Sequence, residues 1–260
     1  MDIMTLAGFS VGAAVVLWGI LSSGIADKLA DPKGMIIVLG GTLASILINT
    51  SYKRFLSGIK ALFDIIKSSP LPTMDECVRN IVQLSETAQK QGGIMALTNV
   101  DARFAGGFLK RAISVAMTSA QSQETRNILE EEIRRRRLDI SEDSNMYRTM
   151  GVFSPMFGLI GTLFGIIQTL SNISDPTMVG RSMAVAISSA FFGIGFSNLF
   201  CVPVANKIRL RAMEETLVLQ IILEGVIDIM TGKTPHLINM HLRGFNYEES
   251  AAKAPEPKKA

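Results

Sequence analysis

The chain has 260 residues, of which 48% are hydrophobic and 19% are charged, and its mean hydropathy is +0.31. A charged fraction below the rough quarter that is usual in soluble proteins predicts a chain that is partly embedded in a membrane. The formal net charge of +3 is too small to indicate a nucleic-acid-binding protein. The two cysteines and two histidines lack the spacing of a metal site or a disulfide framework, so we expect no bound metal and no cofactor.

Four uncharged stretches of the chain are long enough to cross a hydrocarbon core of about 30 Å as helices. They cover residues 3–26, 34–52, 149–174 and 182–206. No basic segment precedes the first stretch, so we expect it to stay in the mature protein rather than to be removed as a signal peptide. The expected fold class is therefore an all-α membrane protein with four transmembrane helices and a helical cytoplasmic domain between the second and the third.

The domain organisation and the orientation follow from these spans and from the basic residues. We expect two spans with a short external loop in residues 1–52, a cytoplasmic domain in 53–148, two spans in 149–206, a cytoplasmic helix in 207–243 and a disordered tail in 244–260. Lysines and arginines follow the second and fourth spans and precede the third, whereas the two short connections carry few of them. The positive-inside rule therefore predicts that both termini and the large domain face the cytoplasm.

The cytoplasmic domain is expected to be helical throughout. Its expected helices are a continuation of the second span as far as Pro70 and Pro72, a helix between Thr73 and the Gly92–Gly93 pair, and helices over residues 104–119 and 124–140. The continuation is predicted to be amphipathic, because its apolar residues recur at helical spacing. Thr73 and Glu76 form a capping-box pattern, which marks a helix N-terminus.

The helix expected over residues 124–140 carries three glutamates, each four residues ahead of an arginine. They are Glu130, Glu131 and Glu132, followed by Arg134, Arg135 and Arg136. This is the favourable order for ion pairs on a helix surface, each worth about 0.2–0.5 kcal/mol. The pattern has two interpretations: a solvated, salt-bridged face, or a surface that binds a protein or lipid headgroups.

The sequence carries no motif that predicts catalysis. Gly8, Ser10 and Gly12 match the spacing of a nucleophile elbow, but they lie inside the first span rather than at a strand-to-helix turn. We therefore expect that the protein is not an enzyme.

Small and hydroxyl-bearing residues recur at helical spacing in the third and fourth spans. They are Pro155, Gly158, Thr162, Gly165 and Thr169 in the third span, and Ser182, Ala186, Ser189 and Gly193 in the fourth. Such faces have two explanations, close packing of helix backbones in lipid or an ion path. Pro155 and Pro203 each remove a backbone hydrogen bond, which a membrane tolerates where a neighbouring helix or a water-lined path satisfies the freed carbonyl.

The third span and the segments after it resemble a known family of membrane proteins. The sequences GVFSPMFGLIGTLFGIIQTLSNISDPTMVG, SMAVAISSAFFGIGFSN, VPVANK and ILEGVIDIMTGKTP are similar to those of MotA/PomA flagellar stator proteins, and the likeness runs to about Gly232. The resemblance implies an ion-conducting stator subunit of the bacterial inner membrane, which couples proton or sodium flow to rotor torque. It also implies a ring of five such subunits around two copies of a single-span MotB/PomB-type partner, working against a FliG-type rotor switch protein.

The resemblance further suggests which residues serve the ion and the movement. Pro155 and Pro203 match the two prolines that couple ion passage to movement in the family, and Thr162 matches its ion-path hydroxyl. Ser189 and Ser188 are further hydroxyls expected along the path. Sodium-driven relatives have paired threonines where this chain has Ser189 followed by alanine, which favours protons as the coupling ion.

Charged residues of the cytoplasmic domain are expected to contact the rotor. The candidates are Lys90, Asp101, Arg134, Arg135 and Arg136. Relatives carry Leu-Glu-Glu after the Gly-Gly turn where this chain has Leu-Thr-Asn, and Arg-Lys before it where this chain has Lys-Gln, so the rotor-facing charge pattern is only partly kept. Exposed charges set orientation and encounter between partners more than affinity.

The four expected spans contain no aspartate, glutamate, lysine, arginine or histidine. A proton or sodium relay normally uses an ionisable side chain, so the titrating group is expected on the partner's single helix. Two other functions stay open at this point. One is an ExbB/TolQ-like energiser of envelope transport, although those proteins have three spans in another order, and the other is a membrane scaffold that conducts nothing.

Overall fold

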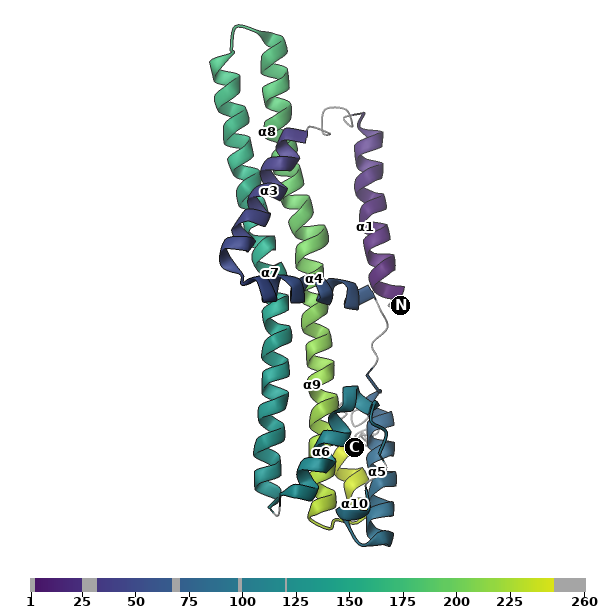
Figure 1. Cartoon of the computed structure of the whole chain (residues 1–260). Coiled ribbons are helices and arrows are strands. Elements are labelled where there is room, and N and C mark those ends of the chain that lie inside the picture. Colours follow the sequence, from purple (N-terminus) through teal and green to yellow (C-terminus); the bar gives the residue numbers. More distant parts are fainter. Residues whose placement is uncertain (1–2, 25–31, 67–70, 98–99, 120, 246–260) are drawn as a thin grey trace, which may run out of the picture. The chain divides into compact units, whose positions relative to one another are not determined.

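The computed structural model describes residues 3–24, 32–66, 71–97, 100–119 and 121–245. These residues form helices joined by short connections, with no β-strand among them, which confirms the expected all-α fold (Figure 1). They divide into two compact units, one made of residues 1–69 and 140–210 and the other of residues 70–139 and 211–260. Each unit has its own cluster of buried apolar side chains.

Apolar helices dominate the first unit. Its elements are α1 (Ile3–Ser22), α3 (Pro32–Asn49), α4 (Tyr52–Ile66), the second half of α7 (Ser122–Ser171), α8 (Pro176–Phe196), the π-helical turn η3 (Ser197–Cys201) and the start of α9 (Val202–Met230). In the described part of the chain, the helical stretches long and apolar enough to cross a membrane are Pro32–Asn49, Ser122–Ser171 and Pro176–Met230, and a shorter apolar helix covers Leu6–Ser22. These are the helices of a membrane protein. The last two residues of the expected first span, 25 and 26, lie outside the described residues.

The second span does not continue into the next helix as the sequence predicted. α3 ends at Asn49, and α4 begins at Tyr52 and lies crosswise to α3 (Figure 1). The Tyr147 hydroxyl of α7 donates to the Gly58 carbonyl of α4 at 3.0 Å. A straight continuation of α3 would lose this contact and would remove the apolar side of α4, including Leu62, from the core of the unit.

α7 is one helix of 50 residues where the sequence predicted two. The expected helix over residues 124–140 and the expected span over residues 149–174 are joined. Residues 141–148 contain neither proline nor glycine, so nothing between the two segments stops the helix. In a similar way, η3 connects α8 to α9 without an intervening loop.

The second unit packs amphipathic helices around an apolar core. Its elements are α5 (Met74–Gln91), the short segments η1 (Ile94–Ala96) and η2 (Phe104–Gly107), α6 (Phe108–Thr118), α10 (Pro235–Arg243) and the residues of α7 and α9 that belong to this unit. Phe108, Leu129, Leu219 and Ile238 are fully buried in its core. Each of them comes from a different helix, so burying them ties α6, α7, α9 and α10 together.

Helix ends in the second unit follow the sequence signals at α5 but not at α6. The Thr73 hydroxyl accepts from the Glu76 N–H at 3.3 Å and the Glu76 carboxylate accepts from the Thr73 N–H at 2.9 Å, which confirms the capping box. The bond from the Thr73 backbone lowers the pKa of Glu76. Gly92 ends α5 in the left-handed region with φ of 93°. α6 begins at Phe108 rather than at residue 104, because Ala105 and the two glycines after it have positive φ.

Candidate functional site

α7 and α8 approach each other closely along a line of small residues (Figure 1). We call this line the seam; it consists of Gly158, Gly161 and Gly165 of α7 with Ser182, Ala186, Ser189 and Gly193 of α8. A Cβ on Gly158 would lie 2.9 Å from the carbonyl oxygen of Ser189, and a Cβ on Gly165 would lie 2.7 Å from that of Ser182. No side chain fits at such distances, so the two helix backbones are in direct contact.

Ser188 and Ser189, both expected on the ion path, lie buried where α3 meets the seam. The Ser189 hydroxyl donates to the Val185 carbonyl at 2.7 Å, and that of Ser188 also donates to a carbonyl of its own helix. A Cβ on Gly34 of α3 would lie 2.8 Å from both hydroxyl oxygens. The pair therefore packs between three helices of the same chain.

Thr162, the other hydroxyl expected on the ion path, is only partly buried on α7. Its hydroxyl donates to the Leu159 carbonyl at 2.6 Å. The three expected hydroxyls thus differ in burial: Ser188 and Ser189 are covered within the unit, whereas Thr162 is partly exposed. A buried hydroxyl can meet an ion only after the helices around it move.

Pro155 and Pro203, the expected coupling prolines, have different surroundings. Pro155 lies inside α7 and has no N–H, so the helix offers no backbone donor to the Gly151 carbonyl four residues earlier. The Ser197 hydroxyl of η3 donates to this carbonyl at 2.6 Å. Pro203 is exposed and follows Val202, whose N–H closes the π-helical turn on the Ser197 carbonyl. The carbonyl freed by Pro155 is therefore satisfied by the neighbouring helical segment.

Two more serines link α7 to the segment that follows the seam. The hydroxyl of Ser154 donates to the Gly193 carbonyl at 2.9 Å, and the hydroxyl of Ser144 donates to the Ala205 carbonyl at 2.8 Å. Both serines are buried. Sequence reasoning does not find these residues or Ser197, because a helical serine usually bonds a carbonyl of its own helix and no sequence signal marks the exceptions.

The expected rotor contacts Lys90 and Asp101 are exposed in the second unit. Lys90 lies in the last turn of α5, and Asp101 lies in the connection that follows η1. The Asp101 carboxylate accepts from the Arg103 N–H at 2.9 Å, which leaves its second oxygen to solvent or to a partner.

The three arginines expected at the rotor are paired with glutamates. The pairs join Arg134 and Arg135 to Glu131, and Arg136 to Glu132 and Glu215. Arg134 thus pairs at a spacing of three rather than the predicted four. The hydrogen bonds from Arg134 and Arg135 lower the pKa of Glu131. The salt-bridged face predicted for this helix is present, and its outer arginines are exposed.

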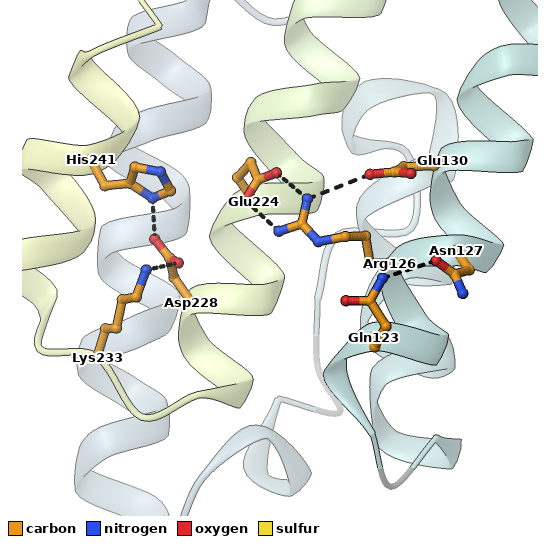
Figure 2. A network of polar contacts seen from close by, with 8 residues as sticks. All are labelled: Gln123, Arg126, Asn127, Glu130, Glu224, Asp228, Lys233 and His241. Carbon is orange, nitrogen blue, oxygen red and sulfur yellow. Dashed lines mark hydrogen bonds and ion pairs between the residues drawn. The ribbon is translucent and has the colours of Figure 1, made fainter.

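A polar network that sequence reasoning does not single out anchors α10 (Figure 2). Asp228 of α9, whose side chain is 2% exposed, pairs with Lys233 and with Nδ1 of His241 at 2.6 Å each. Beside it, both guanidinium NH groups of Arg126 bond Glu224, at 2.5 and 2.8 Å, and this contact raises the pKa of Arg126 (Figure 2). A lone aspartate in the apolar run GVIDIM is the signal that predicts such a network, because a buried carboxylate needs partners.

Comparison with known proteins shows which proteins this chain is similar to. Residues 100–221 match the MotA/TolQ/ExbB proton channel family. The chain is 28% identical to chemotaxis protein PomA of Vibrio alginolyticus over 255 residues, which cover 97% of this chain and 98% of PomA. It is 26% identical to motility protein A of Aquifex aeolicus over 239 residues, which cover 92% and 94% of the two chains.

Two solved structures share the fold along nearly the whole chain. The structure of C. jejuni MotAB matches with a TM-score of 0.86 at 19% identity, covering 99% of this chain and 98% of the matched chain. The flagellar MotAB stator complex from Bacillus subtilis matches with a TM-score of 0.86 at 21% identity, covering 97% and 100%. The chain is therefore similar to the MotA/TolQ/ExbB proton channel family over residues 100–221, and to PomA and motility protein A along almost their full length.

Proposed function

We propose that this chain is the ion-conducting stator subunit of a bacterial flagellar motor, working with a MotB-type partner in the inner membrane. One observation carries the proposal: a chain similar to a proton channel family packs its spans into a close seam that contains no ionisable residue. A relay for protons or sodium needs a titrating group, so that group comes from the partner. An aspartate on the partner's single helix supplies it, and proton binding to this aspartate drives movement of the ring.

The proposed topology has four spans with both termini in the cytoplasm. Residues 53–148 and 207–243 form the cytoplasmic part. Residues 246–260 of the tail expected after them lie outside the described residues. Basic residues beside the second, third and fourth spans support this orientation. Five copies surround two copies of the partner and turn against a FliG-type rotor protein.

In this ring Thr162 faces the partner's acid, because it is the expected hydroxyl that stays accessible in the chain. A threonine hydroxyl can hydrogen-bond a protonated acid or help replace an ion's water shell. Ser188 and Ser189 are buried on α8. Their hydroxyls reach the ion path when the helices move about Pro155 and Pro203. The exposed charges of the second unit meet the rotor.

A stator is favoured over an ExbB/TolQ-like energiser by the named relatives. PomA aligns with 97% of this chain, so its alignment must include most of both apolar helices that precede residue 53. The family match alone, over residues 100–221, does not separate the two functions, because it covers both groups.

Swimming of a stator-deleted strain that carries this chain and its partner tests the proposal. The double variant Thr162→Val and Ser189→Ala is expected to assemble but to produce no torque, because it removes hydroxyls from the path. Ser171→Ala is the matched control: Ser171 is another hydroxyl of α7 that bonds its own helix, to the Ile167 carbonyl at 2.9 Å, and it is not on the face that carries Thr162. The control is expected to keep swimming.

Ion flux through the purified chain without a partner would overturn the proposal, as would full torque from the double variant. Failure of the unaltered chain to restore swimming, alongside restored outer-membrane transport in an energiser-deleted strain, would assign the ExbB/TolQ-like function instead. The coupling ion is read from the same strain. Motility that tracks external sodium at fixed proton-motive force would assign sodium, and motility independent of sodium would assign protons.

A further inference from the structure

Ser197 lies where the segment of α7 before Pro155 contacts the π-helical turn before Pro203. We infer that Ser197 is a positioning residue whose hydroxyl replaces the backbone donor that Pro155 removes, and so latches the segment before Pro155 to the π-helical turn before Pro203. The inference rests on the proposed function in one respect: the expected effect of Ser197 on swimming requires that the chain is a stator subunit. One side chain would thus connect the segment before Pro155 to the turn before Pro203.

The behaviour of the neighbouring serines shows that the Ser197 contact is not the default. The hydroxyls of Ser182 and Ser189 donate to the carbonyl four residues earlier in their own helix. For Ser197 that carbonyl would be Gly193, which already accepts from the Ser197 N–H and from the Ser154 hydroxyl. The Ser197 hydroxyl instead donates across to Gly151 at 2.6 Å.

The packing around this bond holds Ser197 and Gly151 close together. Ser197 is 4% exposed, and Gly151 is buried against it. A Cβ on Gly151 would lie 3.1 Å from a methyl carbon of Val202 and 3.5 Å from the Ser197 hydroxyl oxygen, so glycine permits the approach. An unsatisfied carbonyl in hydrocarbon is costly, hence the serine bond closes the gap that Pro155 opens.

The same residue also belongs to the π-helical turn. The Ser197 carbonyl accepts from the Val202 N–H, and the next residue is Pro203. π-helical turns are rare and occur frequently at functional sites. Under the proposed function, rotation of one segment against the other about Pro155 and Pro203 breaks the bond between Ser197 and Gly151, and the return movement remakes it, so the bond is a reversible latch.

A double-mutant cycle tests the latch in the full chain purified with its partner, by unfolding in mixed micelles titrated with SDS. Ser197→Ala is expected to lower the folded-to-unfolded ratio roughly tenfold, as the loss of one buried hydrogen-bond donor predicts. In a Pro155→Ala background, residue 155 regains an N–H that can serve Gly151. There the Ser197→Ala change is expected to lower the ratio less than about twofold.

Ser144→Ala is the matched control, because Ser144 makes the same kind of bond to a carbonyl in an unbroken stretch of helix, Ala205. Its cost is expected to be the same with proline or alanine at position 155. Cells with Ser197→Thr, which keeps the hydroxyl, are expected to swim faster than cells with Ser197→Ala at equal protein level. An effect of Ser197→Ala that does not depend on residue 155 would overturn the latch. Because unfolding is measured without motility, that result is distinct from a failure of the chain to support swimming at all.

Discussion

The geometry of the seam predicts that the methyl group added by Gly193→Ala pushes α7 and α8 apart. The methyl group added by Gly195→Ala, two residues away, is predicted to leave their contact unchanged. A Cβ on Gly193 would lie 2.8 Å from the Ser154 carbonyl oxygen and 3.0 Å from the Gly158 Cα, and both are backbone atoms that cannot rotate away. A Cβ on Gly195 would meet nothing within 4 Å. Overpacking costs about 1–3 kcal/mol, and contact with two backbone atoms of α7 argues for the upper end. Replacing helical glycine by alanine recovers about 0.5–1 kcal/mol.

The expected net effect is therefore a loss of about 2 kcal/mol for Gly193→Ala and a gain of up to about 1 kcal/mol for Gly195→Ala, a difference of roughly 3 kcal/mol. Heating the purified complex in detergent and measuring the fraction that stays monodisperse would show Gly193→Ala unfolding at the lower temperature. Swimming is expected to fall for Gly193→Ala alone. Equal thermal stability of the two variants would refute the reasoning that backbone contact defines the seam.

Three further predictions concern the second unit. Burial raises the pKa of Cys77 to about 12, so its thiol is protonated at pH 8. The thiol should react with iodoacetamide only after denaturation, because the thiolate is the nucleophile. Rapid labelling of the native chain would contradict this. Asp228→Asn should destabilise the unit by about 1–3 kcal/mol in denaturant titration, whereas Glu131→Gln on the exposed face should leave the midpoint unchanged. Charge reversal at Lys90 or Asp101 should reduce swimming at unchanged membrane levels, and unchanged swimming of the single and double reversals would remove both residues as rotor contacts.

Much of the fold follows from the sequence through short-range physics. Uncharged runs about as long as a bilayer is thick predict the apolar helices, and the Thr73–Glu76 capping box and Gly92 place both ends of α5, as the structure confirms. The small residues of the third and fourth spans predict a close contact because their spacing sets them on one face of each helix. The resemblance of these spans to MotA/PomA proteins is confirmed by the comparisons, which match the same proteins along most of the chain.

What the sequence by itself determined is therefore the fold class, the apolar helices and the likeness to MotA/PomA proteins. The predicted packing face of α7 holds at Gly158 and Gly165, but Gly161 rather than Thr162 lies between them in the seam. Only the tertiary structure decided the direction of α4, the continuity of α7, the burial of Asp228 and the partner of the carbonyl that Pro155 frees. The sequence does not distinguish a serine that bonds its own helix from one that bonds a neighbouring helix. Ser197 bonds the Gly151 carbonyl of α7 because Gly151 and η3 are packed together. Local signals act along one helix, whereas such a bond depends on where a second helix lies, which residue spacing alone does not encode.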